Sequence, residues 1–325
     1  MAKLKYCVLG LCVLIHSNTF SQNENGLRIN VTDEGIFIYH NKMIRNEGFN
    51  IYRDGEKINT EPIRPVTYPE ELQVALGEQY NMLAGAAGAT RAQNLYLKLI
   101  SNRTLNQLAV FLFPSAAKAL GKLYIDPIAA DGRTKTYKVE FTDELGQPTG
   151  EAYQTSVVLS PSRLAAPSDL KVSNKGTRVT LDWEYPKLEK GEDDKVIQFH
   201  IFKKTTLGDV KLNDNIIIRN AGVRKHTVSF TALETGITET YYVVALDISQ
   251  RKSPPSESIN FFIRDNMAPP QVSGVTTLAG SDRITVTWNS NTAPDAAGYY
   301  VYRSKRMREG YKKINQKPLD LLTTF

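Results

Sequence analysis

One motif occurs three times in this chain of 325 residues, and it constrains the fold more than any other feature. Each copy is a run of alternating apolar residues, then a polar turn, then the triplet Lys-Ile-Asn or Lys-Leu-Asn. The copies occupy residues 48–59, 199–213 and 298–315. A strand, a turn and a second strand make a β-hairpin, and Asp54-Gly55 in the first copy suits a two-residue hairpin turn. The repeat therefore predicts several similar β-modules rather than one catalytic domain.

Residues 1–21 have the pattern of a secretory signal peptide. Lys3 and Lys5 precede an apolar run at residues 6–15, which is short for a membrane-spanning helix, and a polar stretch follows. Small residues near Ser21 favour cleavage after it. An uncleaved membrane anchor is the alternative. We expect an exported protein with no integral membrane span in the mature chain.

Cleavage after residue 21 would remove both cysteines, Cys7 and Cys12. A lipoprotein site needs a small residue before its cysteine, whereas Tyr6 and Leu11 stand there, so lipid anchoring is disfavoured. The mature chain would have neither disulfides nor thiolate metal sites, and its domains must rely on hydrophobic cores. Loss of the two leader lysines lowers the formal net charge from +6 to +4, which argues only weakly for an anionic partner.

Residues 164–265 have the strand pattern of a compact β-sandwich. Residues 179–183 alternate apolar and polar positions up to Trp183, and Tyr241 opens a later Tyr-x-Val-x-Ala strand. A leucine precedes this tyrosine, at Leu233. A tryptophan, a leucine and a tyrosine in these places resemble the fibronectin type III family. The resemblance implies an immunoglobulin-like sandwich with Trp183 and Tyr241 in its core.

The same pattern begins again at residue 266 and includes a second tryptophan strand that ends at Trp288. No Tyr-x-Val-x-Ala strand follows. We therefore expect residues 266–325 to be the N-terminal half of another fibronectin type III domain, with Trp288 in its core. An unfinished sandwich exposes strand edges, so the missing strands should come from a longer chain or from a partner.

Residues 22–163 carry a looser version of the pattern, with Tyr39 near the tryptophan position and Tyr137 in the core of the late strand. Between them, residues about 67–121 have helical patterns, and Thr67 can cap the first helix, whose first turn is acidic. We expect a mainly β chain of tandem immunoglobulin-like (fibronectin type III) sandwiches, the first with a helical insertion.

No motif of known chemistry stands out. His16 lies in the leader, and His40, His200 and His226 lie in or beside predicted strands, without a nucleophile elbow, a zinc motif or a phosphate loop. An acid-pair hydrolase stays formally open. The acidic residues 192–194 lack the spacing of a calcium loop and are flanked by lysines, so they indicate a solvated loop. We expect no enzyme, no cofactor and no metal site.

The insertion holds the best candidate for a partner-binding site. Residues 105–113 are apolar on nearly every side and must be buried. One interpretation is that they pack on their own sandwich. The other is that Tyr96, Phe111 and Phe113 form part of a patch for another protein, since contiguous apolar surface usually marks an interface.

The densest basic cluster comprises Arg303, Lys305, Arg306 and Arg308, after the strand of the third repeat. A solvated hairpin tip is one interpretation, and contact with an anionic glycan or lipopolysaccharide is the other. Aromatic residues suited to base stacking are not interleaved with it, so nucleic acid is a poor candidate ligand.

These patterns favour an exported, non-enzymatic interaction or scaffold protein that binds another exported or outer-membrane protein. The leader and the many Asn, Ile and Lys residues resemble exported proteins of the Bacteroidota, which implies a cell-surface, outer-membrane-associated or extracellular place beside a secretion, gliding or adhesin complex. One alternative makes the modules spacers of a secreted hydrolase with its catalytic domain beyond residue 325. Another is carbohydrate binding, which predicts exposed, coplanar aromatic side chains, with Tyr299 and Tyr302 as candidates.

Overall fold

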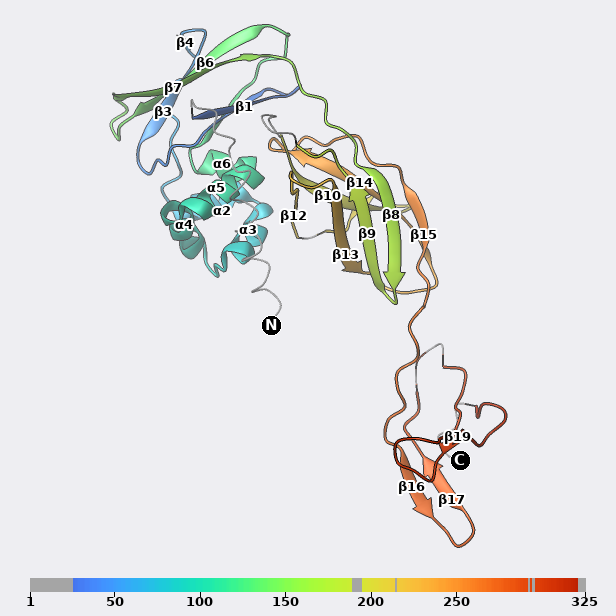
Figure 1. Cartoon of the computed structure of the whole chain (residues 1–325). Helices are drawn as coiled ribbons and strands as arrows, with labels where there is room; N and C mark the ends of the chain where they lie inside the picture. The colour runs from blue at the N-terminus through green and yellow to red at the C-terminus, as the bar shows by residue number, and fades with distance from the viewer. Residues whose placement is uncertain (1–25, 189–194, 214, 292, 294–295, 321–325) are drawn as a thin grey trace. The chain divides into compact units, whose positions relative to one another are not determined.

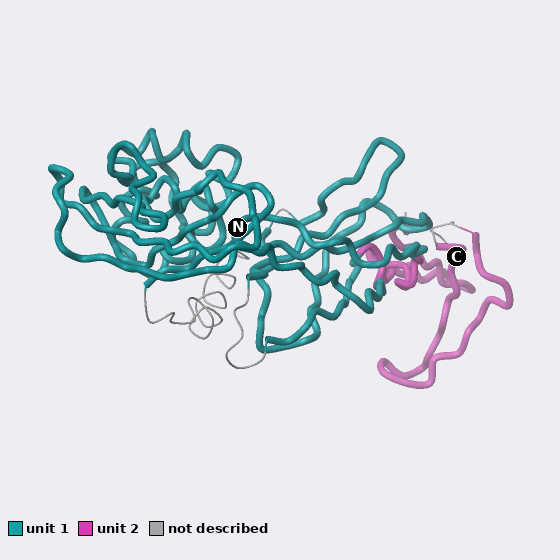
Figure 2. Tube along the Cα trace, turned by 90° about the horizontal axis from the view of Figure 1, so that it is seen from above, with its two compact units in different colours: residues 1–174, 178–263 teal, residues 175–177, 264–325 magenta. Residues whose placement is uncertain are grey.

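The structure is a computed structural model that describes residues 26–188, 195–213, 215–291, 293 and 296–320. It divides into two compact units (Figure 2). Unit 1 contains the described residues up to Asn174 together with Arg178–Ile263, and unit 2 contains Lys175–Thr177 and the described residues from Arg264 onward. The chain is mainly β, with tandem immunoglobulin-like sandwiches and helices in the first of them, which confirms the predicted fold class.

Two antiparallel sheets form the first sandwich of unit 1 (Figure 1). One has the order β1-β2-β5, from β1 (Leu27–Val31), β2 (Ile36–His40) and β5 (Leu123–Asp126). The other has the order β4-β3-β6-β7, from β4 (Glu56–Lys57), β3 (Gly48–Arg53), β6 (Thr134–Thr142) and β7 (Pro148–Val158). Tyr137, at 0% exposure, lies in the core between the two sheets.

Between β4 and β5 the described chain forms five helices, here called the helical subdomain (Figure 1). They are α2 (Pro69–Leu76), α3 (Gln79–Ala87), α4 (Ala92–Ser101), α5 (Arg103–Leu112) and α6 (Pro114–Ala119). Helix α2 begins one residue later than Thr67 predicts, because Tyr68 is its N-cap residue. The Glu71 carboxylate accepts hydrogen bonds from the backbone N–H groups of Tyr68 and Thr67, so an acidic side chain in the first turn caps the helix.

The helical subdomain enters and leaves the sandwich at one point. The backbone N–H of Val66 donates to the carbonyl of Ala119 at 2.8 Å. Gly121 has φ of 60°, and a Cβ there would lie 2.6 Å from the nitrogen of Pro65. Only glycine fits such a turn against a proline. The two ends of the insertion are thereby joined beside the sheet.

Strand β2 is buried on both faces, and this explains its unbroken apolar run. Ile36 and Ile38 belong to the core between the two sheets, whereas Phe37 and Tyr39 belong to the core of the helical subdomain. Tyr39, which faces the helical subdomain, therefore lies next to the tryptophan position and not in it. His40 takes it, with its ring edge-on to Phe49 at 4.8 Å, as Trp183 stands to Phe199 in the second sandwich at 5.2 Å.

The second sandwich also has two sheets. The first has the order β13-β9-β8, from β13 (Lys225–Thr231), β9 (Arg178–Glu184) and β8 (Ser168–Lys175). The second has the order β11-β10-β14-β15, from β11 (Val210–Lys211), β10 (Val196–Lys204), β14 (Thr238–Asp247) and β15 (Ile259–Phe262), with β12 (Ile217–Ile218) also paired to β10. Trp183 and Tyr241 lie in its core at 1% and 0% exposure.

The corner before β14 differs from the family pattern. Leu233, which the resemblance matches to the leucine before the corner, is 94% exposed. Ile237 packs against the core instead. The hydroxyl of Tyr241 donates to the carboxylate of Glu239.

Unit 2 contains two hairpins, β16 (Thr276–Ala279) with β17 (Ile284–Thr287) and β18 (Tyr302–Arg303) with β19 (Lys312–Lys313). Trp288 and Tyr299 are each 7% exposed, with their rings edge-on at 5.3 Å. Ile284, four residues before its tryptophan, is 56% exposed, whereas the equivalent Val179 of the second sandwich is 0% exposed. Among the residues described for unit 2, no strand covers this position.

The last residue of each repeat has the same role, which we call the asparagine clamp. Its side-chain oxygen accepts a hydrogen bond from the backbone N–H of the preceding strand at 2.7 to 2.8 Å: Asn59 from Ile51, Asn213 from Ile201, and Asn315 from Val301. Its side-chain nitrogen donates to the carbonyl two residues further on, at 2.7 to 3.1 Å: Glu61, Asn215 and Lys317. The amide thus acts as a rung of the sheet where strand pairing ends.

The three hairpins share one register. The strand residues pair at equivalent places: Tyr52 with Lys57, Phe202 with Lys211, and Tyr302 with Lys313. Asp54 and Gly55 have φ of 53° and 90°, which confirms the predicted two-residue turn with two left-handed positions.

Replacement Asn213→Ala would leave the buried N–H of Ile201 without its acceptor. An unsatisfied buried donor costs about 1–3 kcal/mol, so we expect urea denaturation to show a loss of about 2 kcal/mol in the free energy of unfolding. Asn213→Asp keeps the acceptor oxygen and should lose less. An unchanged urea midpoint for Asn213→Ala would show that the clamp does not stabilise the module.

Candidate functional site

The residues predicted to bind a partner are not equally accessible. Phe113 is 4% exposed and lies in the core of the helical subdomain, because α5 ends there and turns into α6. Tyr96 is half-buried, and its hydroxyl donates to the carbonyl of Val66 at 3.3 Å. Phe111 is half-buried with the Arg28 guanidinium 6.0 Å from its ring centre. Phe113 is thus unavailable to another protein, and a patch at Tyr96 and Phe111 stays a prediction.

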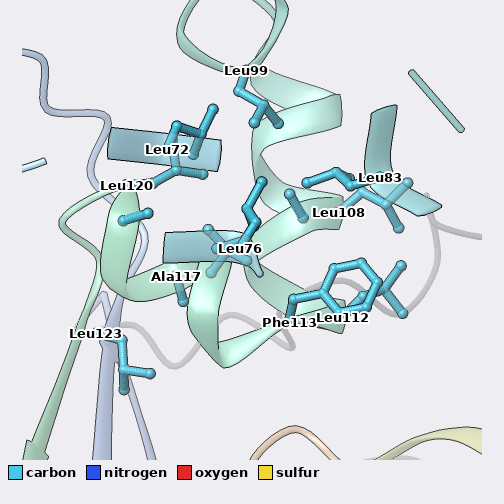
Figure 3. Packing of buried hydrophobic residues seen from close by; sticks show 14 of the residues in the cluster. Leu72, Leu76, Leu83, Leu99, Leu108, Leu112, Phe113, Ala117, Leu120 and Leu123 are labelled. Carbon is cyan, nitrogen blue, oxygen red and sulfur yellow. The ribbon is translucent and has the colours of Figure 1, made fainter. Parts of the chain in front are cut away.

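The apolar helical segment is buried by more than its own sandwich. Figure 3 shows side chains of α2, α4 and α5, among them Leu76, Leu99 and Leu108, converging on one cluster. The same cluster contains Ile197 and Ile248 of the second sandwich, at 1% and 0% exposure. The helical subdomain therefore joins the two sandwiches through a shared core, an arrangement that neither interpretation of the sequence included.

A buried carboxylate anchors this contact, and we call the group around it the Asp247 junction. Asp247 ends β14, and its side chain is 0% exposed. It accepts hydrogen bonds from Asn30 Nδ2 of the first sandwich and from Arg251 Nε, both at 3.1 Å. The backbone N–H groups of Ser249 and Arg251 each donate to its other oxygen at 2.9 Å. The same Asn30 nitrogen lies 2.7 Å from the Ser249 hydroxyl.

Two further hydrogen bonds join the loop after β14 to the first sandwich. The Tyr39 hydroxyl donates to the carbonyl of Ile248 at 3.1 Å, and Gln250 Nε2 donates to the carbonyl of Leu112 at 2.9 Å. Burial raises the pKa of the Tyr39 hydroxyl far above its ordinary value, so it stays a donor at any physiological pH. This loop is used for contacts within the chain.

The basic cluster lies in unit 2, on the loop between β18 and β19. Its four members are exposed. Arg303, Lys305 and Arg306 line a surface hollow of about 590 Å³, and Lys312 joins them from β19. Arg306 is paired with the carboxylate of Glu309. The structure thus groups four cations around one concave surface, namely Arg303, Lys305, Arg306 and Lys312. Arg308, the remaining member of the predicted cluster, lies outside its lining.

Tyr299 and Tyr302 do not form the exposed, coplanar aromatic pair considered for carbohydrate binding. Tyr299 is 7% exposed and packs on Trp288, whereas Tyr302 is 55% exposed. Residues three apart on an extended strand face opposite sides. The two rings therefore do not present one flat surface to a sugar.

The three histidines beyond the leader are strand residues, as predicted, in β2, β10 and β13. Burial lowers the pKa of His40 to about 3 and those of His200 and His226 to about 4, so all three are neutral at pH 7. Among the described residues no group of three His, Cys, Asp or Glu could hold a metal ion, and residues 192–194 lie outside them. No helix of the described chain is long and apolar enough to span a membrane.

One lysine of the first sandwich, Lys122, is buried. Lys122, between α6 and β5, is 2% exposed, and its Nζ lies 3.4 Å from the sulfur of Met43. Burial, with a smaller effect of the Arg103 charge, lowers its pKa to about 8. The protonated side chain is thus costly to bury at neutral pH.

Comparison with known proteins gives no family. No protein family model matches the sequence, and no curated protein matches it. The chicken CNTN1 FN1-FN3 domains are 10% identical, with 93% of this chain and 86% of that chain covered and a TM-score of 0.28. The chicken interferon gamma receptor alpha chain is 9% identical, with 74% and 97% covered and a TM-score of 0.26. Since both TM-scores are below 0.5, the fold assignment rests on the strand order itself.

Replacement Asp247→Ala would leave Asn30 and Arg251 without their shared acceptor. Breaking such a buried polar group costs about 3 kcal/mol. Because of the shared core, we expect unit 1 of the wild type to unfold in one calorimetric transition, and this transition should split into two in the variant, one for each sandwich. Asp209→Ala, which removes an exposed carboxylate of the second sandwich, should leave one transition. One unshifted transition in Asp247→Ala would contradict a coupling role.

Replacement Lys122→Met would remove a buried charge without shortening the side chain. Because the folded pKa of about 8 lies below the unfolded value of 10.5, the unfolded chain binds the extra proton between them. The contribution of Lys122 to the stability of the wild type is therefore lowest below pH 8 and rises as the pH increases toward 10.5. We expect the variant to gain about 2 kcal/mol at pH 7 and to lose this rise, measured by urea denaturation from pH 7 to 10. A destabilised variant at pH 7 would contradict this.

Proposed function

We propose that the chain is an exported, non-enzymatic scaffold protein of the bacterial cell surface, which binds another exported or outer-membrane protein as a subunit of a larger complex. Modules with fibronectin-type-III-like folds commonly act in protein interaction. The signal-peptide pattern of residues 1–21 supports export.

The shared core between the helical subdomain and the second sandwich carries this proposal. Domains within one chain ordinarily move relative to each other across polar interfaces. Here Ile197 and Ile248 join an apolar cluster of the first sandwich, and the carboxylate of Asp247 binds Asn30 in a buried site. Modules that serve only as spacers do not need a buried contact of this kind between them. A scaffold does, because two binding surfaces must keep a fixed spacing to engage partners together.

The helical subdomain also offers surface for a partner. Its exposed apolar side chains include Val74 on α2 at 82% and Leu97 on α4 at 49%. Apolar side chains exposed on a folded surface are candidates for the centre of an interface, while buried ones such as Phe113 are not. We therefore place the partner contact on the outer surface of α2 and α4, with Tyr96 of α4 at its margin.

The test is recovery of the partner from the source bacterium. The full-length gene product, tagged at its own locus, would be cross-linked on intact cells and purified, and its companions identified by mass spectrometry. We expect one stoichiometric exported or outer-membrane protein, reduced about tenfold by the pair Val74→Glu and Leu97→Glu, since buried apolar anchors dominate interfaces.

The control is Leu145→Glu, which places the same charge at an 85% exposed position of the first sandwich. It should leave recovery unchanged. A chain that stays in the cytoplasm would overturn the proposal. So would hydrolytic activity in a longer gene product that purifies without a companion, and this result would favour the hydrolase alternative.

A further inference from the structure

The three copies of the hairpin share one frame and differ in the loop that it carries. The asparagine clamp and the strand register are the same in all of them. The loop comprises residues 54–55 in the first copy, 204–209 in the second and 304–311 in the third. The first loop is a minimal turn. The third is therefore an enlarged loop on a frame that does not need it.

The cation that ends the first strand of each hairpin has a carboxylate partner in two copies, whereas the described residues offer none in the third. Arg53 forms a two-pronged pair with Asp126 at 2.8 and 2.9 Å. Lys203, at the same register position, pairs with Glu239 at 2.7 Å. For Arg303 no carboxylate partner lies among the described residues. The position in the third copy is thus left free to bind an external anion.

The rest of the third loop carries more positive than negative charge. Lys305, Arg308 and Lys312 also lack a carboxylate partner in the described part of unit 2. Glu309 is paired with Arg306. Several exposed cations within one loop create a local positive potential, because salt screens a charge strongly only beyond about 10 Å.

The loop holds these cations in a fixed arrangement. The hydroxyl of Ser304 accepts a hydrogen bond from the backbone N–H of Arg306 at 2.9 Å and donates to the carbonyl of Glu309. The hydroxyl of Tyr311 donates to the carbonyl of Met307 at 2.9 Å. A loop tied to itself in this way loses less conformational entropy when a ligand binds.

We propose that this hairpin is a binding site for an acidic polysaccharide, with sugar carboxylates or sulfates held by Arg303, Lys305 and Lys312, which line the hollow. A guanidinium group can bind two oxygens of such an anion at once, and a lysine ammonium adds a point charge. The hollow of about 590 Å³ is of the size that takes a small ligand, here one or two sugar units of the polymer. Tyr302 and Tyr311, 55% and 56% exposed, are not part of its lining, so we expect charge to dominate the binding. The choice of a polysaccharide over other polyanions rests on the export proposed above.

The test is binding of the purified full chain to two probes, polygalacturonate and heparin, with neutral dextran as the uncharged control. We expect binding to both acidic glycans and none to dextran. The triple variant Arg303→Gln, Lys305→Gln and Lys312→Gln should weaken binding at least about tenfold and flatten its dependence on salt.

A matched control removes the same charge elsewhere. Lys171→Gln, Lys175→Gln and Lys225→Gln replace three exposed lysines of the second sandwich strands and should leave affinity unchanged. Near-ultraviolet circular dichroism would check that the tryptophan environments, including that of Trp288, are kept in each variant.

Equal loss in both triple variants would overturn the site, since net charge alone would then explain binding. Tighter binding to a single-stranded oligonucleotide or to phosphatidylserine vesicles than to either glycan would overturn the ligand class. These measurements use purified protein, so their failure would leave the scaffold function intact, and failure of export would leave a measured glycan affinity intact.

Discussion

A backbone N–H that is buried at the end of a strand pair must find an acceptor, and this chain meets that need with the same side chain three times. Asn59, Asn213 and Asn315 each replace a missing rung of the sheet with one amide group. Because an amide offers an acceptor and a donor on one planar group, it satisfies the strand and its own following turn together. The hairpins keep the same register, whereas their loops range from the two-residue turn at residues 54–55 to the basic loop at residues 304–311.

The second constraint is the use of both faces of β2. A strand with Ile36 and Ile38 on one side and Phe37 and Tyr39 on the other can be stable only if both faces are covered. The helical subdomain covers the second face, and its remaining apolar surface is closed by Ile197 and Ile248. The Asp247 junction then satisfies the polar groups that this contact buries, since a buried carboxylate without donors would oppose it.

Local patterns predicted the hairpins, the sandwiches and the helices, because each depends on residues close together in the sequence. The turn at Asp54-Gly55 and the core position of Trp183 follow directly from such patterns. The position of Tyr39 could not be predicted in this way, since a strand that is apolar at every residue gives no sign of which face meets which core. Nor could the shared core, in which α5 residues meet Ile197 and Ile248 across a long stretch of sequence. The asparagines were visible as part of the repeat, and only the structure showed which atoms they bind.

The joined ends of the helical subdomain bear on how such a chain arose. With Val66 bonded to Ala119 and Gly121 turned tightly against Pro65, the inserted helices occupy a position that a short connection between β4 and β5 could fill. An ancestral sandwich could therefore acquire the helices in one event without losing its own sheets. Because Phe37 and Tyr39 now pack against the helices, removal of the helices would expose an apolar face of β2 to water. An addition that began as dispensable would thereby become irreversible in evolution.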